Sequence, residues 1–317
     1  MPELWPEASA PLTFAPLRPA PTIRVVHPSG GLRPAEVAAV ARGVEVLRAS
    51  GRFGAVRHDP LPPPQRQGAY LASDDELRLA ELVDAIDDDE VDLIWAARGG
   101  SGAARIAPQV LAHLGQVAHL RRPKVLVGFS DITTLLCCWV RMGWPAVHGP
   151  VVKSLGPNSP VQVDLATLWA VVTGATDRLT FRPTPGATLA GRLVGGNLTV
   201  LASLAGTPLL PQGPGLIWVL EDVKEPLYST DRSLTQLRLA RALSGAAGLW
   251  LGGFSDEREQ AVSDAVAHLC RTDLGLPVVV GAPAGHQGLL QPLPFGVPVR
   301  LDPHAGTLSW RVDHDHA

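Results

Sequence analysis

Three polar residues of this 317-residue chain, Ser130, Glu221 and His286, each follow a short apolar run that reads as a buried strand. A serine hydroxyl is a poor nucleophile until a neighbouring base removes its proton, and imidazole suits that task because its pKa lies near neutrality. A carboxylate can then fix the imidazole tautomer and stabilise the imidazolium. These residue types could therefore form the triad of a serine hydrolase, provided that folding brings them together.

Ser130 is predicted to lie on a tight turn between a strand and a helix. The apolar run at residues 125–127 breaks at Gly128, and a second apolar run restarts at Ile132 with helical character. Such a turn lifts a hydroxyl to the rim of an open sheet and places the following N–H groups at a helix N-terminus. The same position also suits a serine that only caps the helix, so the turn alone leaves both roles open.

Glu221 and His286 also have two interpretations each. Glu221 and Asp222 follow the apolar run at 216–220 and could be a salt-bridged pair or a helix cap. We favour Glu221 because it ends the run directly and should be held rigidly. His286, between Gly285 and Gln287, could be a solvated loop residue. Both residues would have to reach Ser130 across a domain interface, which is a common place for active sites.

The glycine-rich run Arg-Gly-Gly-Ser-Gly at 98–102 could bind an anion through its backbone N–H groups, or could simply be a tight turn that needs positive φ. In the catalytic interpretation, the N–H of Asp131 and one from Gly99 or Gly100 would hold the oxyanion of an acyl-transfer reaction.

Strands and helices alternate up to Met142, which predicts an α/β fold with a doubly wound, mostly parallel sheet. Beyond it the pattern weakens and then resumes, so we expect a second, smaller α/β domain. The expected units are a flexible lead-in (1–20), an N-terminal nucleophile domain (21–152), a linker (153–186) and a C-terminal domain that carries Glu221 and His286 (187–317).

The composition narrows the class of protein. A net charge of −3 gives no global basic field for nucleic acid or membrane surfaces. Three cysteines without a Cys-x-x-Cys pair argue against a disulfide framework and a structural zinc site. No apolar stretch approaches the roughly 18 residues of a membrane span, and the first residues do not resemble a signal peptide. The expectation is a soluble cytoplasmic protein.

Several motifs, in this order and over almost the whole chain after about residue 21, resemble the LD-carboxypeptidases. This serine-peptidase family, the murein tetrapeptide carboxypeptidases, also contains the microcin C self-immunity proteins. The matching segments are His-Pro-Ser-Gly (27–30), Ala-Arg-Gly-Gly-Ser-Gly (97–102), Gly-Phe-Ser-Asp-Ile-Thr (128–133), His-Gly-Pro (148–150), Gly-Gly-Asn-Leu (195–198), Leu-Glu-Asp-Val (220–223), Glu-Pro-Leu-Tyr (225–228), Asp-Arg-Ser-Leu (231–234) and Gly-His-Gln-Gly (285–288).

The resemblance implies that Ser130 is the nucleophile and that Glu221 and His286 complete the triad. It implies an N-terminal sheet like that of class I amidotransferases, a smaller C-terminal α/β domain, and a cytoplasmic homodimer that needs no metal or cofactor. The reaction implied is removal of the terminal D-alanine from the L,D-linked tetrapeptide of recycled peptidoglycan, so the expected partner is a small peptide substrate.

Ser101 departs from the family pattern, which usually has an aromatic residue after the two glycines. We expect the absence of the aromatic ring to widen the substrate pocket and to change how the substrate is bound. A related hydrolase of peptidyl-nucleotides or other amides therefore stays an alternative, as does a non-catalytic binding protein of the same fold. The presence of all three triad residues weighs against the binding protein.

A carboxypeptidase must also recognise a free α-carboxylate, which arginine does bidentately. Arg98 and Arg232 are the candidates because both lie in matching segments. A structural salt bridge is the alternative role for either residue.

Overall fold

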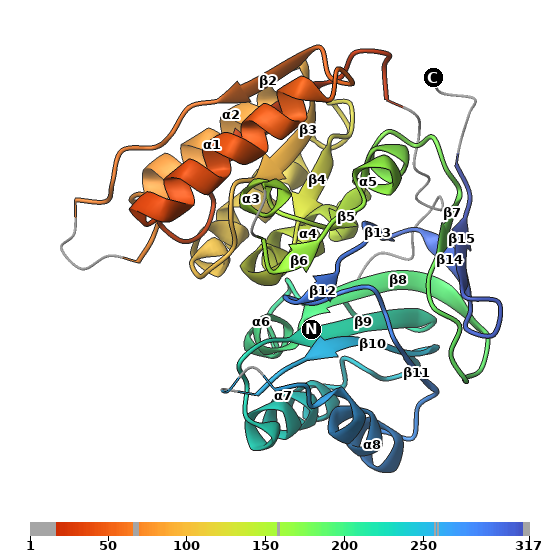
Figure 1. The fold of residues 1–317 in the computed structure, drawn as a ribbon. Helices are drawn as coiled ribbons and strands as arrows, with labels where there is room; N and C mark the ends of the chain where they lie inside the picture. The colour runs from red at the N-terminus through yellow and green to blue at the C-terminus, as the bar shows by residue number, and fades with distance from the viewer. Residues whose placement is uncertain (1–16, 66–69, 157–158, 257, 259, 313–317) are drawn as a thin grey trace.

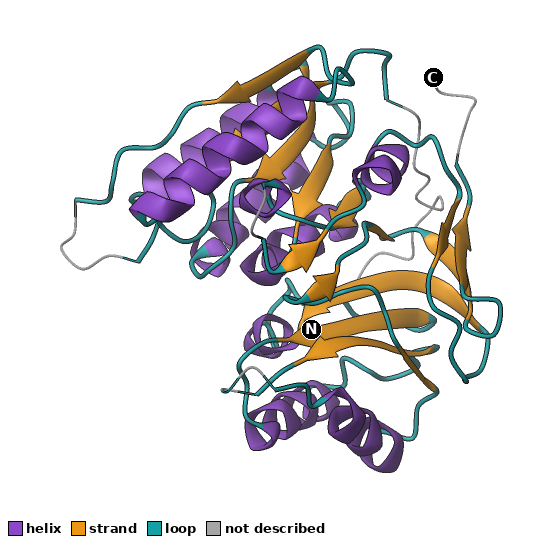
Figure 2. Ribbon diagram, in the orientation of Figure 1, coloured by secondary structure: helices purple, strands orange, loops and turns teal. Residues whose placement is uncertain are grey.

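The computed structural model describes residues 17–65, 70–156, 159–256, 258 and 260–312. It contains two large sheets, each with its own helices (Figures 1 and 2). The lead-in expected at residues 1–20 lies outside the described residues up to residue 16. No helix in the described part of the chain is long and apolar enough to cross a membrane.

The N-terminal sheet is mostly parallel, as predicted, with strand order β13-β5-β4-β3-β1-β2. Its parallel strands are β1 (Thr22–Val26), β2 (Ala55–His58), β3 (Val91–Ala96), β4 (Val125–Gly128) and β5 (Ala146–His148). The helices between them are α1 (Pro34–Ala49), α2 (Asp75–Asp87), α3 (Ala103–Val117) and α4 (Thr133–Arg141). This order reverses direction between β1 and β3, and ligands of doubly wound sheets bind at such a point, beyond the carboxyl ends of the strands.

The C-terminal sheet has the order β11-β10-β9-β8-β14-β15-β7. Its parallel part comprises β8 (Leu189–Asn197), β9 (Leu216–Asp222), β10 (Gly248–Phe254) and β11 (Val278–Val280). The antiparallel part comprises β14 (Pro298–Asp302), β15 (Thr307–Trp310) and β7 (Arg178–Thr180), and β14 and β15 form a hairpin. The helices of this unit are α6 (Leu198–Ser203), α7 (Leu227–Leu239) and α8 (Ser263–Asp273).

The segment expected as a linker supplies elements to both units. Helix α5 (Leu165–Val172) places Trp169 edge-on to Trp95 of β3, with ring centroids 6.0 Å apart. Strand β7 closes one edge of the C-terminal sheet. A short strand, β6 (Val161–Gln162), pairs with β12 (Gly288–Leu289), which directly follows the His286 loop. The linker thus helps to fix the position of that loop.

One strand crosses between the units. Strand β13 (Leu293–Phe295), from the C-terminal part of the chain, pairs antiparallel with β5 and forms the edge of the N-terminal sheet. The two units also meet where the Asn197 backbone N–H donates to Thr133 Oγ1 over 3.1 Å, at the start of α4. The geometry of any site between them is therefore fixed by paired backbone.

Two helical glycines of the N-terminal unit provide a matched test of how closely its helices pack. A Cβ on Gly43 of α1 would lie 2.0 Å from the Val152 carbonyl oxygen, whereas a Cβ on Gly115 of α3 would meet nothing within 4 Å. Gly43→Ala should therefore destabilise the protein by about 1–3 kcal/mol through overpacking. Gly115→Ala should stabilise it by about 0.4–1 kcal/mol because alanine loses less conformational entropy. Thermal and urea unfolding would measure both, and equal effects of the two substitutions would contradict this packing.

Candidate active site

Ser130 lies on the turn between β4 and α4 with a backbone φ of +63°. Non-glycine residues seldom adopt this left-handed conformation, and it is kept where the surroundings impose it. The neighbouring Asp131 side chain supplies part of that constraint, since its Oδ2 accepts from Ser29 Oγ (2.5 Å) and from the Ala103 backbone N–H (2.9 Å). Asp131 thus ties the Ser130 turn to the loop after β1 and to the start of α3.

The glycine-rich loop packs directly against the Ser130 side chain. A Cβ on Gly99 would lie 2.9 Å from Ser130 Cβ and 3.1 Å from its Oγ, so only glycine allows this approach. The Gly30 N–H donates to the Gly99 carbonyl (3.2 Å), and Gly100 has a φ of +118°. The N–H groups of Gly99 and Gly100 donate to no other residue that the structure describes. They are therefore available to an anion beside the hydroxyl.

Glu221 and His286 are hydrogen-bonded, with Nδ1 of the imidazole 2.8 Å from Glu221 Oε2. Glu221 is the last residue but one of β9 and is fully buried. Adjacent Asp222 turns to other partners, because successive side chains of a strand point to opposite faces. Its carboxylate accepts from Asn197 Nδ2 (2.8 Å) and from the N–H and Oγ1 of Thr199 (2.9 and 2.8 Å). Of the two carboxylates, Glu221 therefore orients the imidazole and Asp222 holds the start of α6.

The two partners shift each other's pKa toward the charged forms. Burial alone would raise the pKa of Glu221, but the charge and hydrogen bond of His286 outweigh it and lower that pKa. Burial alone would lower the pKa of His286, but the charge and hydrogen bond of Glu221 raise it above the usual value. The imidazole is thus a stronger base than a free histidine.

Ser130 and His286 line the same cavity of about 470 Å³. The Phe129 ring, next to the serine, lies 4.9 Å from the imidazole centroid. Ser130 and His286, both described, share no hydrogen bond in this structure, and contacts of this kind often tighten only when substrate binds. The structure therefore brings the serine, the imidazole and the buried carboxylate to one place.

The cavity wall carries more positive than negative charge. Its ionisable lining, apart from His286, is Arg33, Arg42, Arg98, Lys153 and Glu36. Glu36 accepts from Arg98 Nη1 (2.7 Å) and from Lys153 Nζ (2.9 Å). Burial would raise the pKa of Glu36, but its hydrogen bonds with Arg33 and Lys153 lower that pKa to about 2. A wall with four cations and one carboxylate favours a negatively charged ligand.

Of the other residues that the sequence suggested for substrate binding, one lines this cavity and two do not. Arg98 lies in the cavity wall, and its Nη1 also donates to the Gly31 carbonyl. Arg232 is not among the residues that line this cavity; its guanidinium lies 5.4 Å over the Tyr228 ring on α7. Ser101 is exposed and lines a separate, larger cavity. Among the described residues, no group of three or more His, Cys, Asp or Glu side chains is placed to hold a metal ion.

Sequence reasoning missed Arg33, Arg42 and Lys153 as cavity residues. Arg33 is the N-cap of α1, and Lys153 lies 117 residues from its partner Glu36. Long-range packing alone brings these side chains together. The one local feature that could have suggested a place for Lys153 in the cavity is its position soon after the His-Gly-Pro motif.

Fold and site together define a two-domain α/β protein of the serine-peptidase type. Residues 23–149 match the LD-carboxypeptidase N-terminal domain, and residues 190–301 match the LD-carboxypeptidase C-terminal domain. The chain belongs to the LD-carboxypeptidase family.

Relatives of known name agree with this assignment. The murein tetrapeptide carboxypeptidase of Pseudomonas aeruginosa is 33% identical over 256 residues, which cover 76% of this chain and 81% of that protein. The structure of muramoyltetrapeptide carboxypeptidase from Oxalobacter formigenes superposes with a TM-score of 0.75 at 26% identity, covering 92% of this chain and 99% of that one. MccF in complex with glutamyl sulfamoyl guanosine shares the fold, with a TM-score of 0.80 at 21% identity over 96% of this chain and 99% of its own.

The Glu221–His286 pair predicts a specific pH dependence. A general base must be unprotonated to accept a proton, so a raised pKa of His286 should place the acidic limb of kcat/KM above about pH 6.5. Glu221→Gln removes the main charge that raises this pKa and should move the limb to lower pH. We also expect kcat to fall by about 10²- to 10⁴-fold, because the imidazole loses its orienting carboxylate.

Asp222→Asn is the matched control, because Asp222 has a carboxylate at the neighbouring position but no hydrogen bond to the imidazole. It should move the limb less than Glu221→Gln. An acidic limb that stays in place in Glu221→Gln would contradict the assignment of His286 as the base.

Proposed function

We propose that this protein is a serine carboxypeptidase that hydrolyses the L,D-amide bond before the terminal D-alanine of muropeptide tetrapeptides. The observation that carries the proposal is that His286, hydrogen-bonded to the buried Glu221, lines the same cavity as Ser130, and that the wall of this cavity carries surplus positive charge. Membership of the family and the similarity to murein tetrapeptide carboxypeptidase support the substrate class. Action in the cytoplasm during peptidoglycan recycling, as a homodimer, is proposed from the family resemblance.

In the proposed mechanism, His286 accepts the proton of Ser130 while Oγ attacks the carbonyl carbon before the D-residue. Glu221 stabilises the imidazolium that forms. The oxyanion is held by the N–H of Asp131 and one from Gly99 or Gly100. The imidazolium then gives its proton to the leaving amine, and the amide bond breaks. Water, deprotonated by the same imidazole, releases the acyl group from Ser130.

The free α-carboxylate of the leaving residue would meet the cations of the cavity wall. Arg98 is placed for this, because its Nη1 is held by Glu36 and Gly31 while its Nη2 reaches the glycine loop, 3.5 Å from where a Gly100 Cβ would be. A guanidinium fixed on one side is pre-organised to bind a carboxylate on the other. Lys153 adds a second positive charge to the same wall.

The first test is Ser130→Ala with muropeptide tetrapeptide as substrate. Release of D-alanine should fall by about 10⁴-fold or more, because no other group can replace the nucleophile. Chromatography of the products would follow the release, and circular dichroism would check that the variant is folded. Wild-type turnover in Ser130→Ala would refute the mechanism. Cleavage of pentapeptide or peptidyl-nucleotide in preference to tetrapeptide would refute the proposed substrate.

The second test compares two arginines. Arg98→Met should raise KM for peptide acids by about tenfold or more, since a charged hydrogen bond to the carboxylate is lost. It should change KM much less for the same peptides with an amidated C-terminus. Arg232→Met is the control and should leave both values near wild type. Equal effects of Arg98→Met on acids and amides would reject this role.

A further inference from the structure

Arg78 of α2 carries a charge and is nevertheless fully buried. Its Nη1 donates to the backbone carbonyl of Pro28 and, over 3.1 Å, to the backbone carbonyl of Gly102. Its Nη2 donates to the carboxylate of Asp75, three residues earlier on the same helix. A charge is costly to bury unless polar or oppositely charged groups bind it, so these contacts hold the guanidinium in one position.

The two carbonyls belong to two different loops beside Ser130. Pro28 lies in the loop after β1, and Gly102 ends the glycine-rich loop, where it is the N-cap of α3. Gly99 of the same glycine-rich loop packs against the serine, since a Cβ on Gly99 would lie 3.1 Å from Ser130 Oγ. The guanidinium therefore holds the two segments that determine where the N–H groups of the glycine-rich loop lie relative to the hydroxyl.

Asp131 holds the same two segments through neighbouring groups. Its buried carboxylate accepts from Ser29 Oγ and from the Ala103 backbone N–H, and Arg78 donates to the carbonyl of the residue just before each of them. The Gly102 carbonyl and the Ala103 N–H belong to one peptide group, so a buried cation and a buried carboxylate bind its two ends. A peptide group held in this way is polarised and has little freedom to rotate.

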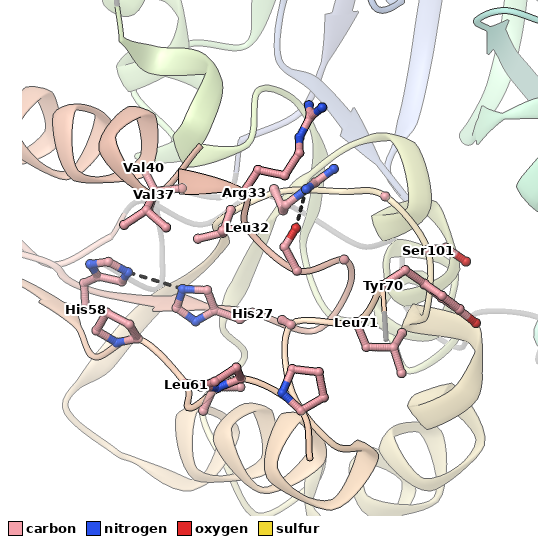
Figure 3. A pocket seen from close by; sticks show the side chains of 18 residues that line it. His27, Leu32, Arg33, Val37, Val40, His58, Leu61, Tyr70, Leu71 and Ser101 are labelled. Atoms are coloured by element: carbon pink, nitrogen blue, oxygen red, sulfur yellow. Dashed lines mark hydrogen bonds between the residues drawn. The ribbon is translucent and has the colours of Figure 1, made fainter. Parts of the chain in front are cut away.

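The glycine-rich loop needs such hydrogen bonds because it lines two cavities. Gly99 and Gly100 line the cavity that contains Ser130 and His286. Gly100 and Ser101 also line the separate cavity of about 810 Å³ (Figure 3). A segment with few close-packed neighbours depends on its hydrogen bonds to keep one conformation.

We propose that Arg78 is a positioning residue for the oxyanion-binding loop. Through the carbonyls of the two loops, it keeps the N–H groups of Gly99 and Gly100 directed at the oxyanion that forms at Ser130. The proposal rests on the proposed function above for the reaction at Ser130. Arg78 itself lines neither cavity, so its loss should slow the chemical step and leave binding of the terminal carboxylate largely unchanged.

Arg78→Ala tests this role. Its kcat should fall by about 10- to 100-fold with KM within about twofold of wild type, because a displacement of the oxyanion donors affects mainly the transition state. Guanidinium chloride, at a concentration too low to unfold the protein, should restore part of the lost kcat by occupying the position of the side chain. Potassium chloride at the same ionic strength should not. The acidic limb of kcat/KM should stay in place, because the Glu221–His286 pair is untouched.

Arg105→Ala is the matched control. The Arg105 guanidinium also binds the Asp75 carboxylate, with Nη2 2.6 Å from Oδ2, but this side chain is 52% exposed. Within the described part of the chain, its side chain donates to Asp75 and to neither loop carbonyl. The control should leave kcat near wild type. A wild-type kcat in Arg78→Ala, or an equal fall in both variants, would overturn the positioning role.

Arg78→Lys carries the same test if Arg78→Ala does not fold. Lysine keeps a cation beside Asp75, but its ammonium cannot reproduce the planar fork of the guanidinium that reaches both carbonyls. Its kcat should therefore also fall, and a folded Arg78→Lys with wild-type kcat would overturn the role.

Labelling of Ser130 by a fluorophosphonate separates this inference from the proposed function. The probe needs the hydroxyl, the base and the oxyanion donors but no peptide, because Oγ bonds to phosphorus as fluoride leaves. Slower labelling of Arg78→Ala than of Arg105→Ala supports the positioning role, even if the wild-type enzyme releases no D-alanine. Equal labelling rates overturn the role, even if D-alanine is released. A wild-type enzyme that is labelled but releases no D-alanine counts against the proposed function alone, and one that does neither overturns both.

Discussion

The hydrogen bond between Glu221 and His286 is the interaction on which the candidate site depends. It lies wholly within the C-terminal unit, while the hydroxyl that it would serve belongs to the N-terminal one. A buried carboxylate without a partner would be costly, so the imidazole and the carboxylate hold each other in place. The pair can act on Ser130 only if the two units keep one relative position.

Three sets of contacts maintain that position. Strand β13 extends the N-terminal sheet, and its Phe295 stacks on the buried His148 at the end of β5, with centroids 5.4 Å apart. Asn197 donates to Thr133 at the start of the helix after Ser130. The pairing of β6 with β12 anchors the chain just after His286, since the Gly288 N–H donates to the Pro160 carbonyl. Each contact joins a segment beside one site residue to the opposite unit or to the chain between the units.

Much of this could be predicted from local sequence. The apolar run, the glycine break and the second apolar run around Ser130 correctly predicted the strand, turn and helix, because each depends on neighbours in the chain. The place of Glu221 at the end of an apolar run suggested a rigid carboxylate, and the structure shows which of the two adjacent carboxylates faces the imidazole.

Features that depend on distant segments could not be predicted in this way. The three residues of β13 include a proline and find their partner in a strand about 150 residues earlier. The cluster of Glu36, Arg98 and Lys153 joins three segments that are far apart in the sequence. Arg98 and Arg232 looked equivalent in sequence, yet of the two only Arg98 lines the cavity that contains Ser130 and His286. The roles of the triad and oxyanion residues stay predictions that the geometry supports.

The crossing strand has a consequence for how the protein is made. Until residues 293–295 leave the ribosome, the N-terminal sheet has β5 as an open edge, with backbone groups that can pair with another chain. Synthesis of the intervening segment lasts many seconds at ordinary elongation rates, of the order of 5–20 residues per second. The nascent chain therefore carries an incomplete sheet until late in its translation, and the candidate active site is completed among the last events of folding.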